Sequence, residues 1–270
     1  MSKVVFITGA TSGMGELSAK FLSDNGYIVY AGSRDATVAE GSSNLKHIYI
    51  DVTNTQSIKD AVAKIIKNEG KIDVLVNNAG FGLLATLEEG SDEEIFKQFD
   101  VNVFGLIKTS REVLPYMREA KSGVIINISS FLGKMGLPLL SHYNASKYAV
   151  EGITDSLRFE TLPFGIRVHS IESGLFGTNF VKKGLIANAK TTSETSPYKD
   201  LVAHFVPIVA KAINEGPTPQ PIADAIKMII EDENAPIAVP VGVEATTFVP
   251  MRKSLSDEEF EQKIKETFGL

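Results

Sequence analysis

Short apolar runs alternate with amphipathic segments of helical length along most of this chain. Residues 4–8 form an apolar run, and a glycine loop at residues 9–15 separates it from a helix pattern. Residues 55–69 carry isoleucine and valine on one helical face, and Gly70 follows as a stop signal. Repeated units of this length predict one α/β domain over residues 1–270, in which a doubly wound parallel sheet has helices on both faces.

The same patterns predict further strands at residues 27–31, 46–50, 72–76, 124–128, 166–171 and 237–239. They predict further helices at residues 16–25, 92–104, 106–120, 141–162 and 222–231, and a charged C-terminal helix at 256–268. Five glycine or polar residues directly follow predicted strands: Gly9, Asp51, Asn77, Ser130 and Ser173. Because ligands of such sheets bind at the carboxyl ends of the strands, we expect these residues to line one continuous crevice.

Composition and charge exclude several classes of function. The net charge is −6 with scattered basic residues, which argues against a nucleic-acid or membrane partner. Since there is no cysteine, disulfides, a thiolate nucleophile and cysteine-bound metals are excluded, and the four histidines lie too far apart to form a metal site. The chain opens directly on a strand pattern, without a signal peptide or an apolar stretch of about 20 residues. We therefore expect a cytoplasmic protein.

Residues 177–221 interrupt the alternation of strands and helices. The segment is polar at residues 191–197, contains five prolines and is apolar at helical spacing over residues 201–213. Loops of this length are uncommon in compact domains unless they are functional or disordered. We expect a partly helical lid over a substrate site; the alternative is an insertion without a role.

The loop after the first predicted strand has the glycine spacing G-x-x-x-G-x-G. Such a loop permits a tight turn, lets the backbone approach a pyrophosphate and opens the N-terminus of a helix, where free N–H groups attract an anion. We expect a Rossmann-type dinucleotide site that includes Gly9, Thr11, Ser12, Gly13, Met14 and Gly15.

The end of the second predicted strand indicates which dinucleotide binds. An acidic residue at this position would bind a ribose 2′-hydroxyl, but Ser33 and Arg34 stand here instead. A guanidinium can bind a 2′-phosphate, so these two residues predict NADP(H) as the cofactor. The alternative is a solvated arginine that Asp35 partly neutralises.

Tyr143 and Lys147 lie one helical turn apart, and Ser130 follows an earlier strand. A free phenol titrates near ~10, and an ammonium on the same helix face favours the phenolate. The pair is therefore suited to moving a proton near neutral pH, while Ser130 donates a hydrogen bond to the reacting oxygen. Taken alone, Tyr-x-x-x-Lys is a common pattern that also fits a half-buried tyrosine and a solvated lysine.

These motifs together resemble the short-chain dehydrogenase/reductase family over residues 3–180. The resemblance rests on the glycine loop, Asn77-Asn78-Ala79-Gly80, Asn102, Ser130 and Tyr143-x-x-x-Lys147. It implies hydride exchange between a nicotinamide cofactor and a ketone or alcohol, with Tyr143 as acid/base. Lys147 would lower the pKa of Tyr143 and bind the nicotinamide ribose. Ser130 would position the substrate, and Asn102 would hold a relay water. It further implies cofactor contacts from Asp51, Val52, Asn78, Ala79, Gly80, Gly174, Phe176 and Thr178, although proline is absent before Gly174.

Residues 137–164 are similar to the branch that contains 17β-hydroxysteroid and retinol dehydrogenases, which implies a bulky apolar substrate. Candidate pocket residues are Phe81, Met135, Leu137, Leu139, Phe176 and Phe180, each of which could instead be core packing. The resemblance also implies a homo-oligomer, a dimer or tetramer, formed through helices 106–120 and 141–162.

We thus predict an NADP(H)-dependent oxidoreductase that interconverts a ketone or aldehyde and an alcohol. The sequence leaves a non-catalytic NADP(H)-binding redox sensor as the alternative. A sugar-nucleotide epimerase or dehydratase shares Tyr-x-x-x-Lys, but it usually has a longer C-terminal domain and different glycine spacing.

Overall fold

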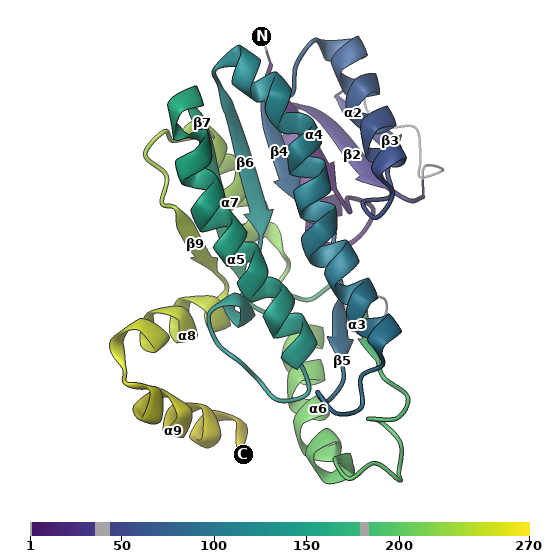
Figure 1. Cartoon of the computed structure of the whole chain (residues 1–270). Coiled ribbons are helices and arrows are strands. Elements are labelled where there is room, and N and C mark those ends of the chain that lie inside the picture. Colours follow the sequence, from purple (N-terminus) through teal and green to yellow (C-terminus); the bar gives the residue numbers. More distant parts are fainter. Residues whose placement is uncertain (1, 36–43, 179–183) are drawn as a thin grey trace.

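Seven parallel strands form the central sheet of the protein. The computed structural model describes residues 2–35, 44–178 and 184–270, and the strand order is β3-β2-β1-β4-β6-β7-β9 (Figure 1). These strands are β1 (Val4–Thr8), β2 (Ile28–Ser33), β3 (Leu45–Tyr49), β4 (Val74–Asn77), β6 (Gly123–Ile128), β7 (Ile166–Ser173) and β9 (Ala238–Val241). The predicted doubly wound α/β fold is confirmed. A small parallel sheet of β5 (Gly82–Leu84) and β8 (Leu185–Ala187) has no counterpart among the predicted strands.

Helices connect the strands and extend the chain beyond the sheet. They are α1 (Gly13–Asp24), α2 (Thr55–Glu69), α3 (Asp92–Phe99), α4 (Gly105–Ala120), α5 (Ser141–Thr161), α6 (Lys199–Asn214), α7 (Gln220–Glu231), α8 (Val243–Ser254) and α9 (Asp257–Phe268). A π-helical turn, Asp100–Phe104, joins α3 to α4, so the predicted helix at residues 92–104 changes its hydrogen bonding midway. Within the described ranges, no helix combines the length and the apolarity needed to cross a membrane.

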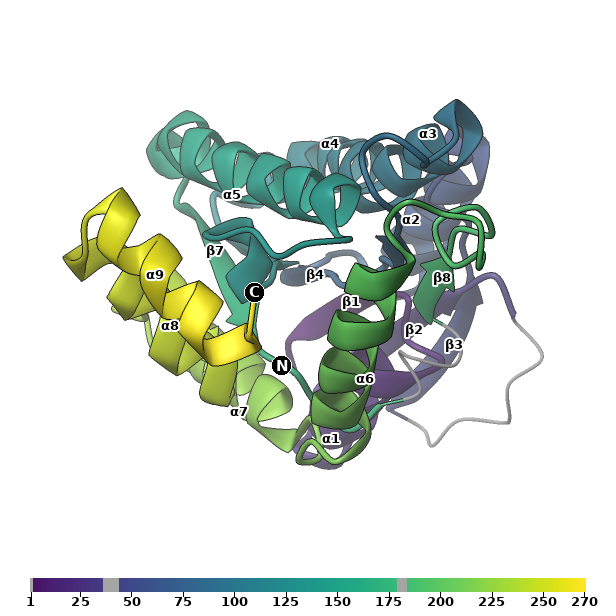
Figure 2. The same ribbon diagram turned by 90° about the horizontal axis from the view of Figure 1, so that it is seen from below.

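The sheet has a separate apolar core on each face. Val5 and Ile7 of β1 belong to the core beneath α1 and α7, while Val4 and Phe6 belong to the core beneath α2, α4 and α5 (Figure 2). Successive side chains of a strand point to opposite faces, so a strand that is covered on both sides is apolar throughout. This explains why the strands read as continuous apolar runs in the sequence.

Local capping residues set the ends of α2 where the sequence predicted them. The side chain of Asn54 accepts hydrogen bonds from the N–H groups of Gln56 and Ser57 at the first turn. Gly70 takes a left-handed conformation (φ 74°) at the other end, which a residue with a side chain rarely adopts. Both signals depend only on neighbouring residues, and the predicted range 55–69 is confirmed.

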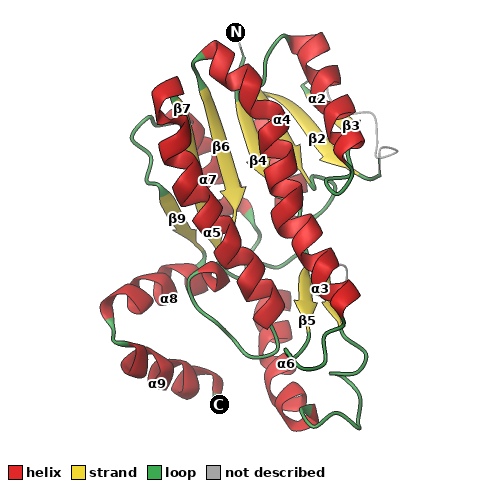
Figure 3. Ribbon diagram, viewed as in Figure 1, coloured by secondary structure: helices red, strands yellow, loops and turns green. Residues whose placement is uncertain are grey.

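Beyond the carboxyl edge of the sheet lie the elements that shape the site. Figure 3 shows α6, α8, α9 and the small sheet below the tips of the strand arrows. The order of the strands reverses between β1 and β4, because β2 and β3 extend to one side and β6, β7 and β9 to the other. In open α/β sheets, ligands bind at such a switch point.

Asn77 does not face the crevice, contrary to the prediction from its place at a strand end. Its amide donates hydrogen bonds of 2.9 Å to Ser110 Oγ and to Asn127 Oδ1, and Asn127 in turn donates to Thr154 Oγ1 at 2.9 Å. This buried network connects β4 and β6 to α4 and α5. The alternation of side chains along β4 turns Asn77 away from the crevice and brings its neighbour Asn78 to it.

Replacing Asn77 by alanine tests this structural role. Asn77→Ala removes the donor to Ser110 Oγ and to Asn127 Oδ1, two buried acceptors, and we expect it to lower the free energy of unfolding by about 1–3 kcal/mol. Urea unfolding measures this change, with the exposed Asn234→Ala as the matched control. A loss of dinucleotide affinity with unchanged stability would show instead that Asn77 faces a ligand.

Candidate active site

A cavity of about 760 Å³ opens at the carboxyl edge of the sheet. Its lining comes from the loops that follow β1, β2, β3, β4, β6 and β7, and from α5, α6, α8 and α9. This volume lies in the range of small-molecule and cofactor sites. Four of the five residues predicted to line the crevice, Gly9, Asp51, Ser130 and Ser173, therefore line this one cavity.

The glycine loop forms the part of the cavity beside α1. Gly9 and Gly13 have positive φ angles of 67° and 55°, and a side-chain carbon at Gly9 would lie 2.8 Å from Ala79 Cα. Within the described chain, Ser12 makes no side-chain capping bond at the start of α1, so this helix end can offer backbone N–H groups to an anion. Thr11, Ser12, Gly13 and Met14 all line the cavity.

Asn78 connects the loops that follow β1 and β4. Its side-chain amide donates to the carbonyl oxygens of Thr8 and Gly9, both at 2.9 Å, while Thr8 Oγ1 accepts from the N–H groups of Asn78 and Ala79 at 3.1 Å. Gly15 does not line the cavity; a side chain there would collide with Gly9 and Asn78. Asn78 thus fixes the shape of the glycine loop, and Gly15 permits the close packing of α1.

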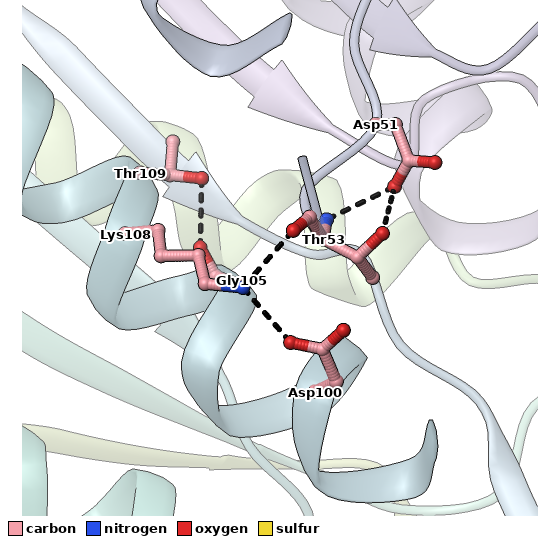
Figure 4. Close-up of polar contacts among 6 residues, drawn as sticks. All are labelled: Asp51, Thr53, Asp100, Gly105, Lys108 and Thr109. Atoms are coloured by element: carbon pink, nitrogen blue, oxygen red, sulfur yellow. Dashed lines mark hydrogen bonds and ion pairs between the residues drawn. The ribbon is translucent and has the colours of Figure 1, made fainter. Parts of the chain in front are cut away.

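Ser33, Arg34, Asp51 and Val52 lie together at the next strand ends and line the cavity. Figure 4 shows Asp51 accepting hydrogen bonds from Thr53, at 2.9 Å from the backbone nitrogen and 2.7 Å from Oγ1. Burial acts to raise the pKa of Asp51, but these bonds and the charge of Arg34 outweigh it and lower the pKa. The site therefore presents an ionised carboxylate beside an exposed guanidinium.

Lys108 on α4 holds the loop that follows Asp51. Its Nζ donates to the carbonyl oxygen of Thr53 at 3.0 Å and pairs with Asp100 Oδ1 at 2.9 Å (Figure 4). The loop after β3 is thereby anchored to α4 and to the π-helical turn at the start of that helix.

Ser130, Tyr143 and Lys147 meet on one wall of the cavity, as predicted. Lys147 Nζ donates to the carbonyl oxygen of Ile128 at 2.8 Å and lies 5.7 Å from the centre of the Tyr143 ring. Ser130 Oγ accepts from the N–H group of Leu132 at 3.2 Å and also bonds the Tyr143 hydroxyl. The strand end after β6 and the first turns of α5 thus bring three polar groups to one point.

Burial shifts the pKa values of Tyr143 and Lys147 in opposite directions. It raises the pKa of Tyr143 to about 12, against an opposing hydrogen bond from Ser130, and lowers the pKa of Lys147 to about 8, against the opposing charge of Glu151. The spacing of Tyr143 and Lys147 predicts a lowered pKa for the phenol, but in the structure desolvation of the phenolate is the larger effect. Near pH 7 the protein therefore holds a protonated phenol beside a charged ammonium.

Asn102 lies behind the cavity wall rather than in it. Its Oδ1 accepts from the N–H group of Phe81 at 3.0 Å, and its Nδ2 donates to the carbonyl oxygen of Phe81 at 2.9 Å and to Ser146 Oγ at 3.1 Å. The π-helical turn places this side chain between the loop after β4 and α5. Its expected role in holding a relay water stays a prediction.

The remaining predicted residues divide into lining and non-lining positions. Ala79, Gly80, Gly174, Phe176 and Thr178 line the cavity, as do the pocket candidates Phe81, Leu137 and Leu139. Met135 is buried in the core next to the cavity, and Phe180 lies outside the described residues. In the described part of the chain, no three His, Asp or Glu side chains gather as metal ligands would.

Sequence reasoning missed a buried cluster of charges behind the wall. Lys134 Nζ lies 3.0 Å from Glu151 Oε2 and 3.6 Å from Glu172 Oε1, and the two carboxylate side chains are only 6% and 1% exposed. Ser170 Oγ adds a hydrogen bond of 3.1 Å to Glu151. Lys134 follows Ser130 by four residues, so this cluster connects the Ser130 loop to α5 and β7. Because its members are far apart in the sequence, no local pattern marks it.

Comparison with known proteins decides the family. The profile described as short chain dehydrogenase matches residues 3–187. The chain belongs to the short chain dehydrogenase family. As a member of it, this protein is an oxidoreductase acting on CH–OH or ketone groups, and its fold is one that binds a nicotinamide cofactor.

Two curated relatives of this short-chain dehydrogenase act on named substrates. A 3-ketodihydrosphingosine reductase from Bacteroides thetaiotaomicron is 39% identical over 240 residues, which cover 89% of this chain and 88% of the relative. Human 17-beta-hydroxysteroid dehydrogenase type 1 is 37% identical over 196 residues, which cover 67% of this chain and 59% of the relative. The predicted similarity to the 17β-hydroxysteroid branch is confirmed.

Solved structures agree with the fold of this short-chain dehydrogenase. A short-chain dehydrogenase from Streptomyces avermitilis has a TM-score of 0.84 at 32% identity, with coverage of 100% of this chain and 98% of that one. ElxO with NADP bound has a TM-score of 0.72 at 26% identity, with coverage of 88% and 96%.

Replacing Lys134 tests whether the charge cluster stabilises the site. Lys134→Met removes the cation that faces two buried carboxylates, and we expect it to lower the free energy of unfolding by about 2–4 kcal/mol at pH 8. Burial and the charge of Glu151 already raise the pKa of Glu172, so protonation at pH 5 removes part of the unpaired charge and the deficit shrinks. Thermal unfolding at both pH values measures this, with Lys134→Arg as the matched control. An equal deficit at both values would contradict the electrostatic explanation.

Proposed function

We propose that this protein is an NADP(H)-dependent reductase of bulky, apolar ketones or aldehydes, reversible as an alcohol dehydrogenase, with Tyr143 as acid/base. One observation carries the proposal: Ser130, Tyr143 and Lys147 share a cavity with the glycine loop at the start of α1. Groups for proton transfer thus lie in the same space as an anion-binding helix end.

The cavity fits a dinucleotide at its β1–β4 end. Gly9 and Gly13 leave the backbone open to close approach, and the first turn of α1 offers N–H groups to a pyrophosphate. Asp51 and Val52 would lie against the adenine, and Lys147 against the nicotinamide ribose. Asn78, Ala79 and Gly80 would line the central part of the cofactor. When bound, the cofactor supplies the hydride for the carbonyl carbon.

The protein's own groups handle the oxygen and its proton. Ser130 Oγ and the Tyr143 hydroxyl are hydrogen-bonded to each other, so a carbonyl oxygen placed between them can accept from both. Tyr143 then gives its proton to the developing alkoxide, and the charge of Lys147 stabilises the phenolate that remains. The raised pKa of Tyr143 means that a proton is present for this step at neutral pH.

The preference for NADP(H) rests on the second strand end. Ser33 and Arg34 line the cavity beside Asp51, and the guanidinium of Arg34 is exposed. Position 33 carries a hydroxyl group instead of a carboxylate, which would repel a 2′-phosphate. Binding of NADP by the structural relative ElxO supports the same choice. A bulky, apolar substrate is supported by the leucines and phenylalanines at the other end of the cavity and by the sphingoid and steroid substrates named for the two relatives.

We also propose a homo-oligomer, for which exposed apolar residues on two helices give support. Phe104, before α4, is 48% exposed and Phe159 on α5 is 74% exposed. A second subunit that covered these helices would remove both side chains from water. A location in the cytoplasm stays a prediction.

Substituting Tyr143 by phenylalanine tests the proposed reaction. Tyr143→Phe removes the transferable proton but keeps the ring, so we expect kcat for carbonyl reduction to fall about 100- to 10,000-fold. NADPH fluorescence titration should give a Kd within about twofold of the wild type, because the pyrophosphate end is untouched. Binding of NADPH by the wild type without turnover of any ketone in a broad screen would favour the redox sensor instead.

Reversing the charge of Arg34 tests the choice of cofactor. Arg34→Asp replaces a partner of the 2′-phosphate by a group that repels it, so we expect the ratio of kcat/KM for NADPH over NADH to fall about ten- to hundredfold. Arg158→Asp, an arginine at the far end of α5, is the matched charge control. An unchanged ratio in Arg34→Asp would overturn the NADP(H) assignment.

A further inference from the structure

Four phenylalanines form a continuous row along the cavity, from the turn beside Ser130 to helix α6. Ring centres of Phe131 and Phe248 lie 6.1 Å apart, those of Phe248 and Phe268 lie 6.0 Å apart, and those of Phe268 and Phe205 lie 5.7 Å apart. All four residues line the cavity, and each comes from a different element: the turn after β6, α8, α9 and α6. We call this set the phenylalanine row.

Phe268 connects the two sides of the row. It lies at the last position of α9, and Figure 2 shows that end of α9 reaching toward α6. His204 Nε2 of α6 bonds the carbonyl oxygen of Phe268 at 2.8 Å. Gly269, with φ 66°, ends the helix directly against His204. The C-terminal turn of the chain is therefore fixed across this end of the cavity.

The cavity is apolar where the row lies. The lining residues of α6 are uncharged: Phe205, Val206, Ile208, Val209, Ala210, Ala212 and Ile213. The one acidic lining residue of the described α8, Glu244, accepts a hydrogen bond of 2.8 Å from the N–H group of Leu175, on the loop after β7. A ligand along the row therefore meets hydrocarbon, and a charged group there would lose its solvation without a partner.

The tilt of the rings distinguishes between two shapes of apolar ligand. The Phe205 and Phe268 rings are inclined by 54°, and the pairs Phe131–Phe248 and Phe248–Phe268 by 25° and 30°. A rigid fused-ring ligand can stack face-on against only one of the Phe205 and Phe268 rings and would meet the other by its edge. A flexible alkyl chain can follow a row of tilted rings.

We propose that the substrate is a neutral ketone or alcohol with a long unbranched alkyl chain, and that Phe268 at the C-terminus determines how much of this chain is bound. The inference rests on the proposed function for the position of the carbonyl group, which lies at Ser130 and Tyr143. The chain then runs along the phenylalanine row and ends at Phe268, which separates it from solvent.

Two fluorescent ketones test this by direct binding. Prodan and laurdan share one naphthyl fluorophore and differ in having a propanoyl or a dodecanoyl chain. Removing the Phe268 ring exposes the end of the long chain to water, so we expect Phe268→Ala to weaken laurdan binding about tenfold and prodan binding less than about twofold. The blue shift of bound laurdan should shrink in parallel.

Phe96→Ala is the matched control, since it removes a phenylalanine of α3 that is 71% exposed and lies outside the lining of the cavity. Phe205→Ala, on the opposite side of the row, should reproduce the selective loss of laurdan, and melting temperatures confirm that each variant is folded. Equal effects on both ketones, or none, in folded Phe268→Ala and Phe205→Ala would overturn the inference. Because binding is measured without turnover, an inactive but laurdan-selective protein would count against the proposed reaction and not against the phenylalanine row.

Discussion

The site depends on one buried ammonium group. Lys147 is removed from water beside Tyr143. Its hydrogen bond to the carbonyl oxygen of Ile128 and the charge of Glu151 offset part of that cost. Burying a cation is unfavourable unless nearby dipoles and charges compensate it. The surroundings of Lys147 provide this compensation, since the end of β6 supplies the carbonyl group and α5 supplies the carboxylate of Glu151. Ion pairs with Lys134 in turn hold Glu151 and Glu172 in place. The geometry around Ser130 and Tyr143 is thus inseparable from the burial of Lys147.

The cavity combines two ends of different chemistry. The β1–β4 end is built from backbone groups whose positions Asn78 and Thr8 fix, and it suits a phosphate-bearing ligand. The other end is built from side chains of α6, α8 and α9, and it suits hydrocarbon. Ser130 and Tyr143 lie where the two meet. The parallel sheet makes this possible, because its carboxyl edge collects loops that are distant in sequence.

Features that depend on neighbouring residues could be predicted from the sequence. The ends of α2, the glycine loop and the Tyr143–Lys147 spacing are of this kind, and nearly all the predicted cofactor residues line the cavity. Features that depend on distant contacts could not. The strands of the small sheet, β5 and β8, are three residues each and lie about 100 residues apart in the chain. Neither the raised pKa of Tyr143, which results from burial, nor the phenylalanine row, which joins four elements, leaves a local signal.

The pH dependence of kcat/KM for NADPH tests whether the buried ammonium of Lys147 controls the site, because this dependence reports ionisations of the free enzyme. The ammonium of Lys147 is lost as pH rises through its pKa of about 8, whereas the phenol of Tyr143 keeps its proton to about pH 12. We expect kcat/KM to fall above about pH 8 in the wild type, and this decline to be absent from the residual activity of Lys147→Met. An identical decline in both proteins would show that a group other than Lys147 controls the reaction.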